Sequence, residues 1–413
     1  MAAMTEAKRT TIGGWLGLSG AQGKLRLARG VLTTANHRIE TVRELPGDAA
    51  MPTVDYGGEG SVILPGFVDT HLHLPQWDSI GAEGLTLLDW LDRVIFPAEA
   101  RWQDPDFAGD MATRAAAELR SFGTTAIAAY GTVHHAGTTA AMRAGAEAGL
   151  RAAVGQVMMD RGAPGELVRP AKQLLEEARA MQSIDWPGRV EHAVSPRFAI
   201  SCTPELLAGA GKLLQESGAI VQTHISEMQP ECERVREMFG GARYAEVYRD
   251  TGLLGPRSVL GHGVWLDDVE RTILRDANAV IAHCPSANLF LDSGMLDLEA
   301  TKAAGVRVSL GSDVAAGSDR SMPRVARWMI ETARARGAAT PPTADQAWWT
   351  ITAGNADALG WHDSGRLTPG AWADLVIATP TRAWSEGTDR ALAHLLYAWD
   401  ERWIDHVMLA GDA

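Results

Sequence analysis

The sequence predicts an α/β protein built on a (β/α)8 barrel, with a small β domain formed by both ends of the chain. Eight short β-branched and apolar runs occur between residues 62 and 314, and helical stretches rich in Ala, Leu, Glu and Arg separate them. That alternation is typical of helices around a parallel sheet. Strand-like segments with glycine and proline between them occupy residues 11–60 and the chain from residue 363. A length of 413 residues is enough for one large barrel and an appendage.

Taken in order, residues 11–60 predict short antiparallel strands because brief apolar alternation is interrupted by glycine and threonine. The predicted barrel strands are the runs 62–73, 124–131, 152–159, 191–198, 220–227, 258–265, 279–286 and 307–314. The predicted helices are 106–121, which opens on Asp106 as its expected cap, 171–182, 204–216, in which Pro204 follows Thr203, and a region over 320–358. We therefore place the small β domain at residues 1–62 and 363–413 and the barrel at 63–362.

Composition and charge exclude several classes of function. The chain is 46% hydrophobic and carries a net charge of −13, from 38 basic and 51 acidic residues without a basic run. Duplex nucleic acid and anionic membranes need clustered Lys or Arg, so neither is an expected partner. Its 3 cysteines, Cys202, Cys232 and Cys284, have no CxxC spacing, which argues against a disulfide framework and a cysteine-based zinc site. The first residues lack the apolar core of a signal peptide, and we expect a cytoplasmic protein.

The stretch LPGFVDTHLHLPQ, residues 64–76, carries the first candidate site. His71 and His73 lie two residues apart at the end of an apolar run, with Asp69 just before them. Alternation along a strand places residues i and i+2 on one face, so both imidazoles are expected to point to the same place. Imidazole is a common ligand of divalent transition metals. The pair predicts half of a metal site, although a pair of this kind also occurs by coincidence on protein surfaces.

The other half is expected at the remaining strand ends, because the carboxyl ends of barrel strands share one face. The polar residues at those ends are Asp69, His71, His73, Arg197, His224, Glu227, His262, His283 and Asp313. His71, His73, His224 and Asp313 together offer three imidazoles and one carboxylate, a set that suits one Zn²⁺, or Fe²⁺, with a position left for water. Taken singly, His224 also fits a core histidine and Asp313 a helix cap. The presence of all four residues at strand ends favours a metal-binding site.

Three further residues receive roles from their positions. Glu227 is the expected proton shuttle beside a metal-activated water, the alternative being a solvated loop carboxylate. His262 is expected to hold or stabilise that water, and the carboxylate of Asp313 could share the proton. His283, followed by Cys284 and Pro285, is expected to be structural.

The motifs PGFVDTHLH, HISE, LGHG, HCPSANLFLDSG and LGSD, in this order, resemble the amidohydrolase superfamily, whose members are metal-dependent hydrolases and deaminases. The resemblance implies a distorted (β/α)8 barrel with a composite β-sandwich from both chain ends, and a homodimer. Within that superfamily, HLHLPQW, the stretch 87–102 and SPRFAISCTPELL at 195–207 resemble the guanine deaminase family.

By this resemblance His71, His73, His224 and Asp313 match the zinc ligands, and Glu227 matches the proton-transfer carboxylate. Gln76, Arg197 and Phe198 match residues that hold the purine, and Trp77, in the same stretch as Gln76, joins the expected substrate-binding residues. An amide can read a ring nitrogen and an amine, a guanidinium can donate to a carbonyl oxygen, and a phenyl ring offers an apolar face. The implied reaction is hydrolytic deamination of guanine to xanthine, in which a zinc-bound hydroxide attacks C2 and Glu227 relays the proton to the amino group.

Two alternatives remain at this stage. One is a deaminase or hydrolase of a related heterocycle, such as 8-oxoguanine, a pterin or an s-triazine, because loop changes alter the substrate on this fold. The other is a non-catalytic scaffold with the same fold, which would be expected to have lost one or more of the ligands that this chain keeps. The deaminase signature with HxE and PCxxC motifs is absent from the sequence, so a zinc deaminase of the nucleic-acid-editing type is not expected.

Overall fold

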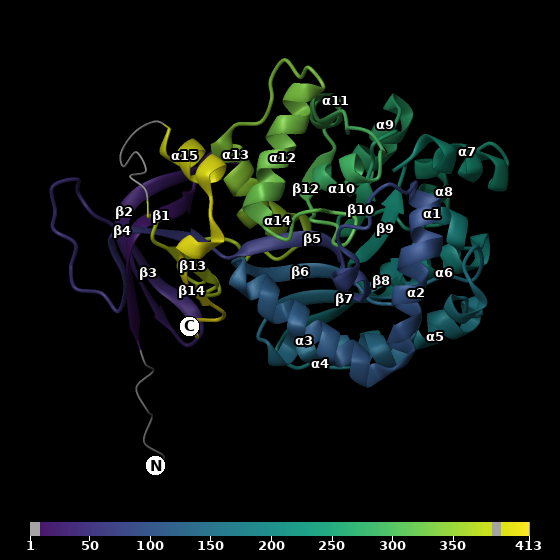
Figure 1. The fold of residues 1–413 in the computed structure, drawn as a ribbon, viewed down its shortest axis with the longest axis horizontal. Coiled ribbons are helices and arrows are strands. Elements are labelled where there is room, and N and C mark those ends of the chain that lie inside the picture. Colours follow the sequence, from purple (N-terminus) through teal and green to yellow (C-terminus); the bar gives the residue numbers. More distant parts are fainter. Residues whose placement is uncertain (1–8, 382–389, 413) are drawn as a thin grey trace, which may run out of the picture.

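The computed structural model describes residues 9–381 and 390–412 and contains two sheets that lie side by side (Figure 1). One is an eight-stranded sheet surrounded by helices, and the other is a six-stranded sheet built from both ends of the chain. The predicted fold class is thereby confirmed. Residues 1–8, 382–389 and 413, which the expected small domain also contains, lie outside the described residues.

Each of the eight predicted runs contributes one parallel strand to the larger sheet, in the order of the chain. Its strands are β5 (Phe67–His73), β6 (Thr124–Tyr130), β7 (Arg151–Met158), β8 (Arg189–Pro196), β9 (Val221–Ile225), β10 (Ser258–His262), β11 (Val280–His283) and β12 (Arg307–Leu310). Nearly every residue of these strands is buried, which explains why they appear in the sequence as continuous apolar runs rather than as alternating ones.

Buried side chains close the barrel between its first and last strands. Thr70 on β5 donates to Leu310 O on β12 at 3.0 Å, and Asn355 adds three further hydrogen bonds. Asn355, fully buried, donates from Nδ2 to the carbonyl oxygens of Val68 on β5, at 2.6 Å, and Leu310 on β12, at 2.8 Å. Its Oδ1 accepts from the Leu310 N–H at 2.9 Å. One step further along, Asp313 N donates to His71 O at 2.8 Å. These bonds hold β5 and β12 together, and predicted metal ligands lie on β5 and in the loop after β12.

Helices surround the barrel. The predicted segments 106–121, 171–182 and 204–216 each correspond to one α-helix, whereas the predicted region 320–358 contains three. They are α1 (Leu87–Trp90), α2 (Phe96–Ala100), α3 (Pro105–Ser121), α4 (His135–Glu147), α5 (Ala171–Gln182), α6 (Pro204–Ser217), α7 (Gln229–Met238), α8 (Tyr244–Asp250), α9 (Asp268–Asp276), α10 (Pro285–Phe290), α11 (Leu298–Ala303), α12 (Met322–Ala335), α13 (Ala344–Trp349), α14 (Asn355–Ala358) and α15 (Ala391–Ala398).

The start of α3 differs from the prediction by two residues. Asp104, not Asp106, caps the helix, and its Oδ1 accepts from the N–H groups of Asp106 and Phe107 at 3.0 and 3.4 Å. Pro105 occupies the first helical position, where a missing N–H group costs nothing. The acidic residue at 106 therefore lies within the first turn rather than before it.

The smaller sheet has the strand order β14-β13-β4-β1-β2-β3. Its strands are β1 (Thr10–Ser19), β2 (Leu25–Ala35), β3 (Arg38–Glu44), β4 (Tyr56–Pro65), β13 (Leu375–Ala378) and β14 (Ile404–Met408). The expected pairing of the two chain ends is present, because β13 lies antiparallel to β4. One pair, β1 with β4, is parallel.

The predicted run 62–73 proves to be two strands, one in each sheet. β4 ends at Pro65, and β5 begins at Phe67. Gly66 lies between them, and a Cβ atom there would come within 2.1 Å of Thr125 Oγ1, so only glycine fits. Residues 62–65 therefore belong to the smaller sheet. The division into two domains remains our prediction.

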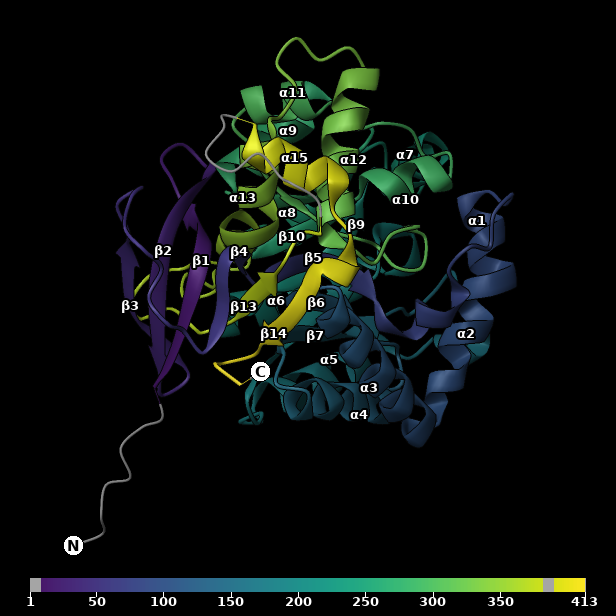
Figure 2. The same ribbon diagram turned by 60° about the vertical axis from the view of Figure 1, so that its left-hand side comes forward.

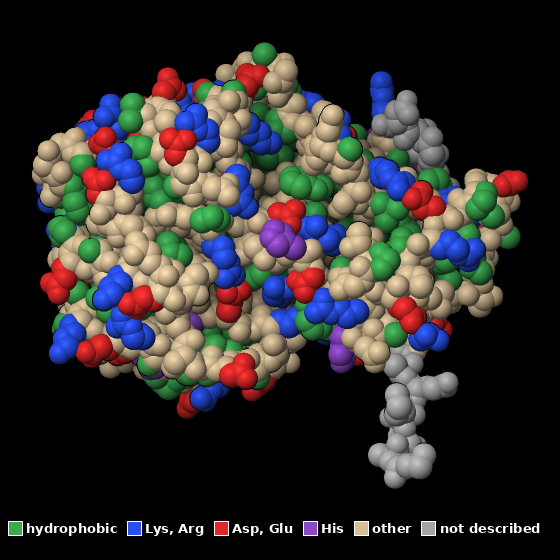
Figure 3. Space-filling view, turned by 180° about the vertical axis from the view of Figure 1, so that it is seen from behind, with side chains coloured by type: hydrophobic (Ala, Val, Ile, Leu, Met, Phe, Trp, Pro, Cys, Tyr) green, Lys and Arg blue, Asp and Glu red, His purple; other side chains and the backbone are tan. Residues whose placement is uncertain are grey.

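The chain between β5 and α3 forms a helical segment at the opposite end of the molecule from the smaller sheet (Figure 2). It consists of a 3₁₀ helix, η1 (Leu74–Ser79), then α1, a π-helical turn, η2 (Leu91–Ile95), and α2. Residues 77–100 are thus largely helical. On the face shown in Figure 3, acidic and basic side chains are interspersed. No helix in the described ranges is long and apolar enough to span a membrane.

Candidate active site

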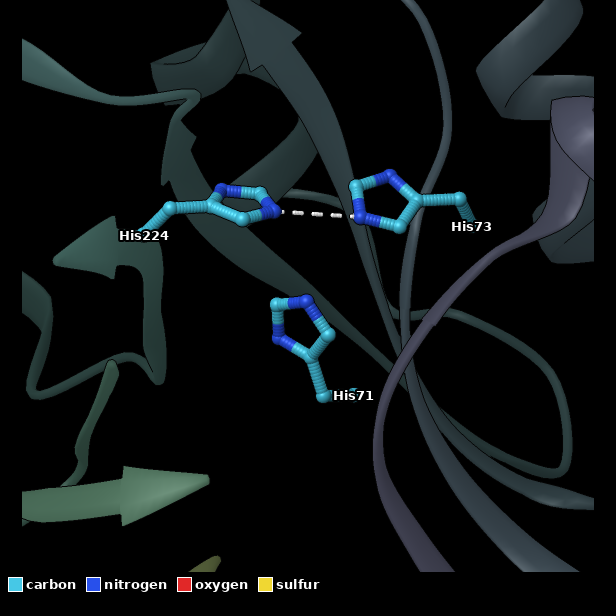
Figure 4. Close-up of side chains that lie close together, drawn as sticks. All are labelled: His71, His73 and His224. Atoms are coloured by element: carbon cyan, nitrogen blue, oxygen red, sulfur yellow. Dashed lines mark hydrogen bonds between the residues drawn. The ribbon is translucent and has the colours of Figure 1, made fainter. Parts of the chain in front are cut away.

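Three imidazoles meet at the carboxyl end of the barrel, from the tips of two strands. His71 and His73 on β5 and His224 on β9 are buried and point toward one another (Figure 4). The Nε2 atoms of His73 and His224 are 3.2 Å apart. The expected convergence of an i, i+2 pair on one point is therefore present, and a third imidazole completes the cluster.

Asp313 brings a carboxylate to the same point from the loop after β12. Its Oδ1 lies 3.4 Å from the Nε2 atoms of both His71 and His73. Asp313 has a left-handed backbone, with φ 51°, an uncommon conformation in which Asp is enriched and which is often found at functional sites. Asp69 supports this loop from β5, because its carboxylate accepts from Ser312 Oγ at 2.5 Å, from Ser312 N at 3.0 Å and from His71 N at 3.1 Å. The four predicted ligands are thus neighbours.

The protonation of these groups suits a metal ion. Burial holds the pKa values of His71, His73 and His224 well below the usual range, so the imidazoles are neutral and their lone pairs are free. His224 Nδ1 donates to Arg197 O at 2.7 Å, which leaves Nε2 as the lone-pair nitrogen. His71 Nε2 has no hydrogen-bond partner within the described ranges. Burial raises the pKa of Asp313 to about 6, an effect that a bound cation would oppose.

A second grouping of nearby ligand atoms contains His71, His262 and Asp313. His262, at the end of β10, directs Nε2 to Glu227 Oε2 at 3.4 Å and to Asp313 Oδ2 at 3.9 Å. Its Nδ1 lies 2.8 Å from Asn288 Oδ1, an acceptor, so the proton is on Nδ1. His262 therefore lies against Oδ2 of Asp313 and the carboxylate of Glu227, whereas His71 and His73 lie against Oδ1 of Asp313.

Glu227 lies at the edge of this cluster and is buried. Ser293 Oγ donates to its Oε1 at 3.1 Å, which orients the carboxylate. Burial, and then the nearby negative charge of Asp313, raises the pKa of Glu227 to about 8. A carboxyl group that binds a proton near neutral pH can both accept and return one, as a proton shuttle must.

A cavity opens beside the cluster, and most of the predicted substrate residues line it. Its lining consists of His73, Gln76, Leu87, Trp90, Leu91, Arg197, Phe198, His224, Glu227, His262, Leu291, Asp313 and Ala316. The wall opposite the imidazoles is supplied by η1, α1 and η2, so the helical segment after β5 covers the site. The lining thus combines apolar side chains with polar and charged ones, as is typical of a small-molecule site.

Trp77 does not line this cavity. Its indole N–H donates to Glu118 Oε2 on α3 at 2.8 Å, and its carbonyl oxygen accepts from Arg320 Nη2 at 2.7 Å. The chain turns into η1 after β5, so adjacent side chains diverge and only Gln76 reaches the cavity. Direct substrate contact by Trp77 is therefore not supported. His283 also lies outside the lining, and burial lowers its pKa to about 3.

Glu99 is a residue of the site that sequence reasoning did not identify. It is buried on α2, and both its oxygens accept from Arg197 Nη1, at 2.7 and 2.6 Å. Gln76 Nε2 donates to Glu99 Oε1 at 3.0 Å. The sequence did offer an indication of Glu99, because it is an acidic residue inside the stretch 87–102, which resembles the guanine deaminase family.

Comparisons with known proteins agree with this geometry. Residues 62–413 match the profile of the amidohydrolase family. A guanine deaminase of Escherichia coli is 34% identical over 326 residues, which is 78% of this chain and 74% of the relative. A probable guanine deaminase of Deinococcus radiodurans is 36% identical over 368 residues, 85% of this chain and 83% of the relative. The crystal structure of a guanine deaminase from C. acetobutylicum with guanine in its active site superposes with a TM-score of 0.91, at 26% identity, covering 98% of this chain and 99% of that one.

Proposed function

The chain belongs to the amidohydrolase family, and from that membership and the geometry of its site we propose that it deaminates guanine hydrolytically to xanthine and ammonia. The observation that carries the proposal is the cavity itself. Its lining joins candidate metal ligands to Gln76, Arg197 and Phe198, the residues expected to hold a purine. The relatives named as guanine deaminases, 34% and 36% identical over most of their length, support this choice of substrate.

We assign the metal to His71, His73, His224 and Asp313. The donor set of three neutral imidazoles and one carboxylate suits zinc, and would also accept ferrous iron. A divalent ion bound there lowers the pKa of a water and so supplies the nucleophile near neutral pH. Elemental analysis of the purified protein tests the assignment. We expect one zinc per subunit, and protein that is active without any bound metal would contradict it.

Side chains of the protein bind the purine and transfer the proton. Phe198 offers an apolar face to the purine ring, and Gln76 and Arg197 provide polar contacts on its edge. Glu227 takes a proton from the attacking water and returns it to the amino group on C2, which leaves as ammonia while the oxygen stays on C2. Ser293 holds the carboxylate in position for both transfers. His262 lies beside Glu227 and Asp313, where its Nε2, the nitrogen without a proton, can accept a hydrogen bond from Glu227 once that carboxylate has taken up the proton.

A substrate panel tests the proposal. Zinc-loaded protein is incubated separately with guanine, 8-oxoguanine, pterin and melamine, ammonia release is measured for each, and xanthine is identified by chromatography. We expect guanine to give the highest kcat/KM. Brisk turnover of another compound without turnover of guanine would move the assignment to a related heterocycle, and no turnover of any compound would favour a non-catalytic scaffold.

We further propose a homodimer in the cytoplasm. The family resemblance supports the dimer, and the three unpaired, buried thiols fit a reducing compartment. Size-exclusion chromatography with light scattering measures the mass in solution. A mass of one chain at micromolar concentration would contradict the dimer.

A further inference from the structure

The buried carboxylate of Glu99 lies behind the two side chains proposed to contact the purine edge. Glu99 is only 1% exposed. It accepts hydrogen bonds from Gln76 at 3.0 Å and from Arg197 at 2.6 and 2.7 Å. Phe96, on the same short helix, packs against Arg197, whose Cζ is 5.6 Å from the ring centroid. Both recognition residues are therefore held by α2, although they come from η1 and from the end of β8.

The charge of Glu99 decides how the Gln76 amide is oriented. A carboxylate in an ion pair with a guanidinium accepts hydrogen bonds and donates none, so the amide must turn its NH₂ group toward Glu99. The amide oxygen is then directed elsewhere. Within residues 9–381 and 390–412, Gln76 Oε1 has no hydrogen-bond partner, and Gln76 lines the cavity. It remains as an acceptor for a ligand.

The guanidinium of Arg197, like the amide of Gln76, uses one group to bond to Glu99 and leaves others without a hydrogen-bond partner among the described residues. Its Nη1 serves Glu99, and the other guanidinium N–H groups form no hydrogen bond to the described part of the protein. Arg197 also lines the cavity, so these groups remain as donors for a ligand. The polar wall of the cavity thus combines an acceptor from Gln76 with donors from Arg197, and the carboxylate behind them neutralises the guanidinium charge.

We propose that Glu99 is a positioning residue that sets substrate specificity, because it fixes Gln76 as an acceptor and Arg197 as a donor. The pair then selects a heterocycle with a cyclic amide edge, in which a ring N–H lies next to a carbonyl oxygen. This inference rests on the proposed function, since guanine has such an edge at N1 and C6. 2-Aminopurine has the same amino group on C2 but lacks both that N–H and that carbonyl.

The test compares guanine with 2-aminopurine in the metal-loaded Glu99→Gln variant. Glutamine keeps the size of the side chain but removes the charge, so the Gln76 amide is free to turn over. We expect KM for guanine to rise about tenfold or more, with a smaller change in kcat. The ratio of kcat/KM for guanine to that for 2-aminopurine should fall at least about tenfold, because that ratio depends on paired polar groups. Metal content should stay at the wild-type level.

The matched control is Glu118→Gln. Glu118 on α3 also pairs with an arginine, Arg320, and also accepts from an indole N–H, that of Trp77. Unlike Gln76 and Arg197, the partners of Glu99, neither Arg320 nor Trp77 lines the cavity. We expect the control to keep the wild-type ratio between the two substrates. A fall in the ratio for both variants would show that loss of any such ion pair is sufficient, and would overturn the inference.

A double variant separates positioning from general damage. Gln76→Asn shortens the amide and leaves the pair of Glu99 and Arg197 intact. If Glu99 acts through Gln76, the two substitutions together lower the ratio by less than the product of their separate effects. Fully multiplicative effects would overturn the inference.

Circular dichroism identifies variants that do not fold. Should Glu99→Gln be one of them, Glu99→Asp keeps the charge but withdraws the carboxylate by one methylene, and a smaller fall in the ratio is expected. A wild-type ratio in either folded variant overturns the inference alone. Wild-type protein that does not deaminate guanine overturns the proposed function, and this inference with it.

Discussion

Replacing Asn355 should loosen the barrel at its closure and weaken the metal site at the same time. Asn355 makes three hydrogen bonds, at 2.6, 2.8 and 2.9 Å, that join Val68 on β5 to Leu310 on β12. In Asn355→Leu, a side chain of similar size fills the space but makes none of them. The change therefore tests the polar link rather than the packing.

The magnitude follows from the groups involved. Three buried hydrogen bonds contribute about 1 kcal/mol each, and the Leu310 N–H, left without its acceptor, costs about 1 kcal/mol more. We expect the free energy of unfolding of the metal-free protein to fall by about 4 kcal/mol. Because β5 carries His71 and His73 and the chain after β12 carries Asp313, metal affinity should also fall, by about tenfold or more.

Urea unfolding followed by circular dichroism measures the first effect, and titration with zinc against a competing chelator measures the second. The control is Thr352→Val. Thr352 is fully buried in the preceding turn, and its hydroxyl donates to Trp348 O at 2.7 Å, within the same helical segment. Loss of this hydrogen bond should lower the free energy of unfolding by about 1 kcal/mol and leave metal affinity unchanged. An Asn355→Leu variant no less stable than the control would refute the role of Asn355 in closing the barrel.

Three substitutions in the site give further expected outcomes. Asp313→Asn should lose both metal and activity, because an amide is a poor ligand for zinc; full zinc content by elemental analysis would contradict the ligand role. Glu227→Gln should bind metal and guanine but lower kcat by about 100-fold or more, since the proton transfer is lost; a near-normal kcat would exclude the shuttle. Arg197→Ala should raise KM for guanine more than it lowers zinc content, and an unchanged KM would remove Arg197 from the pocket.

The sequence predicted the barrel strands well because a parallel sheet buries both faces of each strand. Eight apolar runs were therefore visible as separate segments, and each of them contributes one strand to the barrel. The first run was assigned to one sheet although it belongs to two. β4 and β5 are both buried at their junction, so hydropathy does not change there, and only Gly66 marks the point at which the chain passes between sheets.

The positions of the proposed metal ligands were more predictable than those of the proposed substrate residues, for a related reason. His71, His73, His224 and Asp313 lie on or just after strands, where alternation and the common direction of parallel strands fix where side chains point. Gln76, Trp77 and Glu99 lie in helical turns after β5, where no such rule applies. Trp77 accordingly faces α3, whereas Glu99, 23 residues beyond Gln76, folds back to hold it.

Arg197 connects these two groups of residues through different atoms. Its carbonyl oxygen accepts from His224 Nδ1 at 2.7 Å and so determines which nitrogen of this proposed metal ligand is free. Its guanidinium pairs with Glu99 and lines the cavity. The carbonyl oxygen is independent of the side chain. Removing the side chain should therefore leave the orientation of His224 intact while it exposes an unpaired carboxylate behind the substrate. For that reason the effects of Arg197→Ala on metal content and on KM should separate, and equal losses of both would show that the two groups depend on one another through the side chain as well.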